Sequence, residues 1–175
     1  MKDPLDLHLE DVSWPKARMY KDRNIARAII FDGNKYIFAH IDRDDEFASL
    51  SYIETSGGGV KKGETLEEAL RRELEEELGL QVEIVAYLGQ VIDYYNLIGR
   101  RNLNHYFLVR KTGELPKNLM EDEKMFNLHP VELTYEEAKA EYKRIESDKL
   151  GKLVARREEP VLEKGNAIVT SYGLM

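Results

Sequence analysis

Three glutamates in one short segment have the spacing of a metal-binding site. Glu73 is followed by Glu76 three positions later and by Glu77 four positions later. At about 100° per residue on an α-helix, these side chains project within a sector of roughly 100°, whereas Glu75 points away from them. Like charges at such spacings destabilise a helix by roughly 0.2–0.5 kcal/mol per pair. A divalent cation would reverse that effect, and oxygen ligands suit Mg²⁺ or Mn²⁺.

These carboxylates require a helix, and the neighbouring residues predict where it begins and ends. Thr65 is the predicted N-cap with Glu68 as its capping-box partner, and Gly79 is the predicted stop after Leu78. The glycines at 57–59 let the backbone approach a ligand closely, and a carbonyl group there can complete a metal shell. A solvated acidic helix face is the competing interpretation of a run of glutamates. The glycine turn favours a ligand site over that alternative.

The segment from Gly58 to Leu80 resembles the Nudix box, G-x5-E-x7-R-E-U-x-E-E-x-G-U, in which U is an aliphatic residue. All nine fixed positions match, namely Gly58, Glu64, Arg72, Glu73, Leu74, Glu76, Glu77, Gly79 and Leu80. Nine constraints within 23 residues are far more specific than a lone glycine motif. The resemblance implies the α/β fold of the Nudix family, an α/β/α sandwich with a mixed central sheet.

The resemblance also implies a role for each part of the box. The implied metal ligands are the carboxylates of Glu73, Glu76 and Glu77 and the carbonyl group of Gly57. Arg72 would orient the box carboxylates through an ion pair. Glu64 would hold the turn against the helix, and its alternative role is that of an ordinary acid near a helix N-terminus.

Family members hydrolyse a nucleoside diphosphate linked to another group, so a metal-dependent diphosphohydrolase is the expected function. Mg²⁺ is the expected cofactor, with Mn²⁺ as the alternative. The metal neutralises the diphosphate and lowers the pKa of the attacking water, and a carboxylate takes the proton of that water. The base lies in the box of some members and in a later loop of others, where Glu121 and Glu123 are candidates. An exposed acidic loop is an equally good interpretation of those two residues.

Residues outside the box are expected to select the substrate. Arg43, Arg100 and Arg101 fall in predicted loops where the family often contacts phosphates, and the arginine fork matches phosphate oxygens. A plain surface role is the alternative for each of them. Tyr95 lies close to, without matching, the position of a base-stacking tyrosine in diadenosine polyphosphate hydrolases of the family.

Hydrophobic patterning predicts the strands that hold the box within a single domain of residues 1–175. Strands are predicted at 25–31, 35–41, 50–55, 82–93 and 105–110, and a second helix from Thr134 to Ile145. Residues 1–22 are expected to form an arm or an edge strand, residues 94–104 a polar loop, residues 147–159 a helix or surface segment, and residues 160–175 a packed segment of unclear role. Strands before and after a central helix favour a mixed sheet with helices on both faces.

Composition and net charge limit the kinds of ligand and compartment that are expected for this chain. A net charge of −7 disfavours binding to a nucleic-acid backbone, but not to a small nucleotide. The absence of cysteine excludes disulfides and the cysteine-dependent isopentenyl-diphosphate isomerase chemistry that shares the Nudix fold. No apolar run is long enough to span a membrane and no secretory signal is visible, so the cytoplasm is the expected compartment. A homodimer is a further expectation, because many family members dimerise.

The sequence leaves one alternative to a hydrolase. A Nudix-fold sensor would bind a nucleotide without cleaving it. Such domains are expected to lose box carboxylates, whereas this chain keeps them all.

Overall fold

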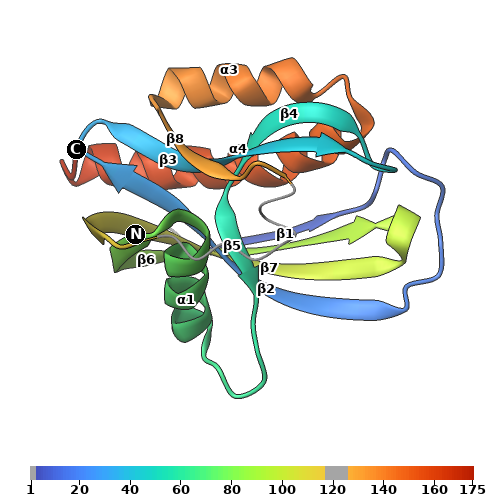
Figure 1. Cartoon of the computed structure of the whole chain (residues 1–175), viewed down its shortest axis with the longest axis horizontal. Helices are drawn as coiled ribbons and strands as arrows, with labels where there is room; N and C mark the ends of the chain where they lie inside the picture. The colour runs from blue at the N-terminus through green and yellow to red at the C-terminus, as the bar shows by residue number, and fades with distance from the viewer. Residues whose placement is uncertain (1–2, 117–125) are drawn as a thin grey trace.

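A mixed sheet with helices on both of its faces forms the fold (Figure 1). The computed structural model describes residues 3–116 and 126–175. Helix α1 packs on one side of the sheet, and helices α3 and α4 pack together on the other side (Figure 1). The predicted α/β class with a mixed central sheet is confirmed.

The described strands are β1 (Leu5–Leu9), β2 (Lys21–Asp32), β3 (Lys35–Asp44), β4 (Ser49–Glu54), β5 (Ser56–Gly59), β6 (Leu80–Tyr95), β7 (Arg100–Glu114) and β8 (His129–Leu133). The described helices are α1 (Leu66–Leu78), α3 (Tyr135–Ile145), α4 (Lys149–Ser171) and the 3₁₀ turn η1 (Asn96–Ile98). The strand order is β1-β6-β7-β2-β3-β4, with β5 paired to β2 and β8 paired to β3. The sheet is mixed because the β1–β6 and β2–β7 pairs are parallel and the other pairs are antiparallel.

Local signals explain the elements nearest to the glutamates. Strands β2 and β3 form the predicted hairpin, with Gly33 at φ 59° in the turn, a backbone conformation that glycine adopts without strain. Helix α1 begins at the predicted N-cap, where the Thr65 hydroxyl accepts a hydrogen bond from the Glu68 amide at 3.1 Å. The helix ends at Gly79 in the left-handed conformation, as predicted.

The prediction of a polar loop at residues 94–104 is wrong. Strand β6 continues to Tyr95 and strand β7 begins at Arg100, so only the short η1 turn separates them. The error has a physical cause, because the first residues of β7 turn buried amides, rather than apolar side chains, to the interior. Asn104 is fully buried and its Nδ2 donates to Asp93 Oδ1 and to the Val91 carbonyl, both at 2.9 Å.

The two ends of the chain also take defined structure. Residues 5–9 form the edge strand β1, which confirms one of the two options for the N-terminal region. Helix α4 follows the N-cap Asp148 and includes most of the charged stretch 147–159 and most of the unassigned stretch 160–175. Within the described parts of the chain, no helix is long and apolar enough to cross a membrane.

Candidate active site

The glycine strand β5 contacts two of the box glutamates, Glu73 and Glu77. A methyl group added at Gly58 would lie 2.4–2.6 Å from the carboxylate atoms of Glu73, so only glycine leaves room for that carboxylate. The Gly57 amide donates to Glu77 Oε1 at 3.3 Å. Glu77 is buried in α1 beside the core leucines, as its position on the helix predicts. The box glycines therefore fix where these two carboxylates lie.

Arg72 is the centre of an ion-pair network that joins the turn to the helix. Its guanidinium donates to both oxygens of Glu64, with Nε at 2.7 Å from Oε2 and Nη2 at 2.9 Å from Oε1. Its Nη1 lies 2.8 Å from Glu73 Oε1 and 3.3 Å from Glu76 Oε2. Its Nη2 also donates to the Gly59 carbonyl at 3.0 Å. The geometry is that of an orienting residue for the box carboxylates.

Two charges of this network, those of Glu64 and Arg72, are stable to titration. Hydrogen bonds from Arg72 and from the Lys61 amide lower the pKa of Glu64 to about 2. The same hydrogen bond to Glu64, with that to Glu73, raises the pKa of Arg72 above its ordinary value. Both groups are therefore ionised throughout the physiological range of pH.

A cavity of about 250 Å³ opens beside Gly57 and Gly58. Its charged lining residues are Arg23, Arg27, Arg43, Glu54, Glu73 and Glu77. Three cations thus face three anions, and two of the anions belong to the box. A divalent ion bound to the box carboxylates would make this cavity positive overall, which suits a phosphorylated ligand.

Arg23 is a cavity residue that the sequence interpretation missed. Within residues 3–116 and 126–175 it forms no ion pair or side-chain hydrogen bond, and its guanidinium Nε lies 3.2 Å from the site of a methyl group added at Gly59. Burial, and then the charge of Arg27, lowers the pKa of Arg23. The available signal was the spacing of Arg23 and Arg27, which places both on one face of a strand.

Arg27 has a different environment from Arg23. Its Nη1 donates to the Thr55 carbonyl at 2.9 Å and lies 3.7 Å from Glu54 Oε1. Its Nε donates to Asn104 Oδ1 at 3.3 Å. These contacts fix the strand that precedes the box glycines.

Arg43 lies in the cavity, although it belongs to the end of strand β3 and not to a loop as predicted. Its guanidinium stacks on Phe126, 4.8 Å from the ring centroid, and on Phe47, 5.4 Å from the centroid. The sequence-based expectation of a phosphate-binding residue therefore falls on a side chain that faces the box carboxylates.

Arg100 and Arg101 lie at the start of strand β7 rather than in the predicted loop, and they differ in position. Arg100 stacks on Tyr95 at 5.5 Å, and its pKa is lowered by burial and then by the neighbouring charge of Arg23. Arg101 instead pairs with Asp22 at 2.7 Å on the surface. The structure thus brings Arg100 towards the cavity arginines and leaves Arg101 apart from them.

Tyr95 is not placed to stack on a base. The side chain is buried, its hydroxyl accepts from Arg157 Nη1 at 2.8 Å, and its ring is covered by Phe47 at 5.9 Å and by Arg100. The expectation of a base-stacking tyrosine is corrected for this reason. Tyr95 is a packing residue beneath Arg100.

A buried charge network connects helix α4 to the cavity. Arg157 is 1 % exposed, and its guanidinium lies 2.6 Å from Glu54 Oε2 and 3.2 Å from Asp93 Oδ2. The adjacent Glu158 accepts from the Thr55 amide at 2.7 Å and from the Thr55 hydroxyl. The strand that leads into the box glycines is therefore held from the opposite side of the sheet.

Glu54 is a further carboxylate in the cavity. Burial raises its pKa, but the charges of Arg27 and Arg157 outweigh burial and hold that pKa below its ordinary value. A carboxylate stabilised in this way is a weak proton acceptor. The two sequence-based candidates for a later base, Glu121 and Glu123, lie outside the described residues.

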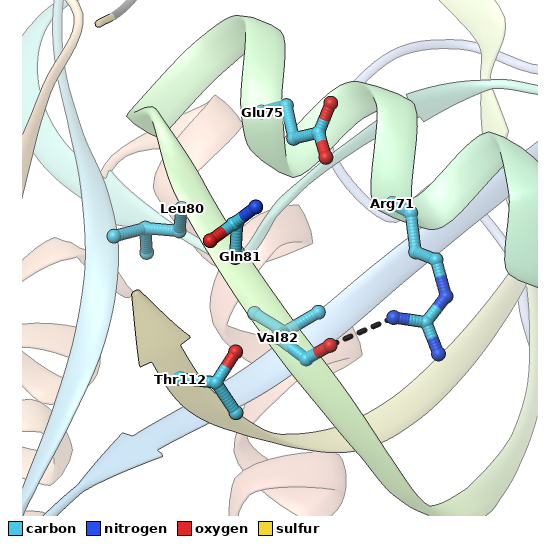
Figure 2. A pocket seen from close by; sticks show the side chains of 6 residues that line it. All are labelled: Arg71, Glu75, Leu80, Gln81, Val82 and Thr112. Carbon is cyan, nitrogen blue, oxygen red and sulfur yellow. Dashed lines mark hydrogen bonds between the residues drawn. The ribbon is translucent and has the colours of Figure 1, made fainter. Parts of the chain in front are cut away.

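The other flank of α1 carries Glu75. Figure 2 shows Glu75 and Arg71 at a separate hollow of about 290 Å³, where Arg71 Nη1 donates to the Val82 carbonyl at 2.7 Å. None of the four predicted metal ligands lines this hollow. The prediction that Glu75 points away from Glu73 is confirmed.

The box residues fit a hard divalent cation by their chemistry. Oxygen atoms from carboxylates and a backbone carbonyl are the donors that Mg²⁺ and Mn²⁺ prefer. Gly58 leaves the space that the Glu73 carboxylate occupies, and Arg72 contacts one oxygen each of Glu73 and Glu76. Within the described residues, no three acidic or histidine side chains already converge on one point.

Comparison with known proteins defines the family. Residues 21–151 match the family model of the NUDIX domain, and the chain belongs to the Nudix family. The nucleoside triphosphatase NudI of Enterobacter sp. (strain 638) is 68 % identical over 66 residues, which cover 38 % of this chain and 46 % of that protein. NudI of Escherichia coli O139:H28 is 40 % identical over 62 residues, 35 % of this chain and 43 % of that protein. The chain thus spans less than half the length of these relatives.

Solved structures share the fold. The solution structure of the Escherichia coli ORF135 protein superposes with a TM-score of 0.59 at 24 % identity, covering 86 % of this chain and 93 % of that one. A NUDIX hydrolase from Nitrosomonas europaea gives a TM-score of 0.64 at 16 % identity, covering 83 % and 88 % of the two chains.

Proposed function

We propose that this chain is a metal-dependent diphosphohydrolase that cleaves a nucleoside diphosphate derivative, with nucleoside triphosphates as the first class to test. The observation that carries the proposal is the network of Arg72 with Glu64, Glu73 and Glu76 beside a cavity lined by arginines. The name of the NudI relatives supports the choice of triphosphates.

Glu73, Glu76, Glu77 and the Gly57 carbonyl would hold Mg²⁺, or Mn²⁺ in its place. When bound, such an ion neutralises phosphate charge and lowers the pKa of a coordinated water. Arg72 donates to Oε1 of Glu73 and to Oε2 of Glu76. Arg72 would then keep both glutamates pointed at the ion while remaining outside the metal shell.

The arginines of the cavity would bind the phosphate groups. Arg23 and Arg43 both line the cavity with Glu73 and Glu77, so a diphosphate held at the carboxylates lies within their reach. Fixed guanidinium groups orient the anion and stabilise the charge that develops on the leaving oxygen. The proton of the attacking water would pass to a box carboxylate, or to Glu121 or Glu123 as the alternatives.

The proposal includes the cytoplasm as compartment and a small nucleotide, rather than a nucleic acid, as ligand. A homodimer is also proposed, and light scattering of the purified chain measures its mass directly.

The test is a screen of nucleoside triphosphates, nucleotide sugars, dinucleoside polyphosphates, NADH and ADP-ribose with Mg²⁺ or Mn²⁺. From a triphosphate, the products expected are a nucleoside monophosphate and pyrophosphate, and hydrolysis in ¹⁸O-labelled water identifies the phosphorus that is attacked. Tight nucleotide binding by calorimetry without turnover of any compound would contradict the proposal and would favour a Nudix-fold sensor.

A further inference from the structure

One of the cavity arginines, Arg43, rests on an aromatic cluster that reaches outside the matched domain. The aromatic cluster consists of Trp14, Phe47, Tyr95 and Phe126. Trp14 packs edge-on against Phe47 with ring centroids 5.7 Å apart, and Phe47 packs against Tyr95 at 5.9 Å. Arg43 lies over Phe47 and Phe126. Trp14 precedes residue 21, where the match to the NUDIX domain begins.

Trp14 is held in place by its own segment. Asp11 Oδ1 accepts from the amides of Ser13 and Trp14 at 2.8 and 3.0 Å, and Asp11 Oδ2 accepts from the Asn96 amide at 2.9 Å. The Asn96 side chain returns a hydrogen bond to the Trp14 carbonyl at 3.1 Å. The Lys149 ammonium lies 6.0 Å from the centroid of the Trp14 ring. The indole is therefore tied to both the η1 turn and the start of α4.

The guanidinium of Arg43 depends on these rings for its direction. Its Nε is buried and has no hydrogen-bond partner in the described residues, and Asp45 Oδ2 lies 3.5 Å from that atom. Within the described residues, two aromatic faces and the Asp45 carboxylate thus fix the plane of the group. Phe47 is one of those faces, and Trp14 packs edge-on against Phe47.

We propose that Trp14 is a positioning residue for substrate binding, acting through Phe47 on Arg43. The segment around Trp14 then supports the phosphate-binding site, although it lies outside the NUDIX match. The inference rests on the proposed function, because it takes phosphate as the ligand of Arg43. It adds a specific dependence of KM on a residue that does not line the cavity.

A double-mutant cycle tests whether Trp14 affects substrate binding through Arg43. Trp14→Ala should raise KM for the best triphosphate by about three- to tenfold, as expected if Arg43 loses its cation–π contact with the Phe47 ring. In an Arg43→Ala background the same substitution should change KM by less than about twofold, because coupled residues do not act additively. Trp14→Phe should restore KM, since it keeps a ring against Phe47. Val12→Ala is the matched control, because Val12 is 54 % exposed in the same segment.

If Trp14 had a purely structural role, the KM values would follow a different pattern. Equal KM increases from Trp14→Ala in both backgrounds would overturn the inference, as would an unchanged KM in the single variant. Chemical denaturation of each variant measures stability separately from KM.

Intrinsic fluorescence supplies a test that needs neither turnover nor a Trp14 variant. Trp14 is the only tryptophan of the chain. Inorganic pyrophosphate with Mg²⁺ should change its emission in the natural chain and leave it unchanged in Arg43→Ala. Calorimetric binding of pyrophosphate without any change in emission would overturn the inference while leaving the proposed function intact. Absence of both pyrophosphate binding and substrate turnover would instead remove the proposed function, and this inference with it.

Discussion

Arg72 donates to both oxygens of Glu64, at 2.7 and 2.9 Å, and so joins the turn before α1 to the face of the helix that carries the box carboxylates. The pair lies eight residues apart in sequence, across the start of the helix. The remaining donors of Arg72 reach Glu73, Glu76 and Gly59. One guanidinium thus sets the relative positions of the glycine strand, the turn and the proposed metal ligands.

The first prediction concerns the pH dependence of stability. The pKa of Glu64 is about 2 in the folded chain against an ordinary value of 4.5, so its ionisation favours folding above 4.5, and this stabilisation is lost as the pH falls towards 2. Glu64→Gln should therefore lose less stability than the natural chain between pH 5 and pH 2. Urea unfolding at several pH values measures this difference. Parallel pH profiles for the two proteins would show that the Arg72 pair does not lower the pKa of Glu64.

The second prediction concerns the space at Gly58. Gly58→Ala should displace the Glu73 carboxylate, because the new methyl group would lie 2.4–2.6 Å from it, and both Mn²⁺ affinity and kcat should fall. Gly113→Ala is a matched control, since its methyl group would meet only the flexible end of Gln81 at 2.8 Å. Mn²⁺ titration followed by electron paramagnetic resonance measures the affinity. Equal Mn²⁺ affinity in the two variants would argue against Glu73 as a ligand held by this contact.

Local sequence signals predicted the elements that carry the box. Helix α1 follows from a Thr65 cap, a stripe of leucines and the Gly79 stop, all of which act within a few residues. The β2–β3 hairpin follows from its turn residues in the same way. These parts could be predicted because their causes are short-range.

The parts that were missed depend on contacts between distant segments. Strand β7 carries two buried asparagines near its start, Asn102 and Asn104, and the Asn104 amide donates to β6, so the polar pattern resembles that of a loop. Helix α4 buries Arg157 and Glu158, which are charged residues that a hydrophobic pattern assigns to the surface. Arg23 reaches the cavity only because β2 pairs with β5 and β7. No local period in the sequence encodes such pairings.

The third prediction separates the cavity arginines from the surface arginine. Arg23→Ala should raise KM for the substrate by roughly ten- to a hundredfold, the range expected for a charged hydrogen bond to phosphate. Arg101→Ala should change KM by less than about twofold, because Arg101 pairs with Asp22 on the surface. Steady-state kinetics at saturating Mg²⁺ measures both. A larger effect from Arg101→Ala would place the phosphate site at the outer end of β7.

The fourth prediction concerns the buried network of α4. Arg157→Met should lower the free energy of unfolding by about 3–5 kcal/mol, because it leaves Asp93 and Glu158 buried without this cation and leaves Glu54 with Arg27 alone. Arg144→Ala, which breaks an exposed pair with Glu141, should cost less than about 1 kcal/mol. Urea denaturation measures both values. A small cost at Arg157 would mean that water or a shifted pKa replaces the lost charge.

The most direct measurement of the central claim compares Glu77→Gln with Glu75→Gln in the hydrolysis of a nucleoside triphosphate with Mg²⁺. The two residues are two positions apart on α1, but Glu77 lines the cavity and Glu75 lines the separate hollow on the other flank. Removing one carboxylate charge at Glu77 should reduce kcat by orders of magnitude while the chain stays folded, and the same change at Glu75 should leave kcat nearly unaltered. Equal losses at the two positions, or full activity in Glu77→Gln, would contradict the assignment of catalysis to this face of the helix.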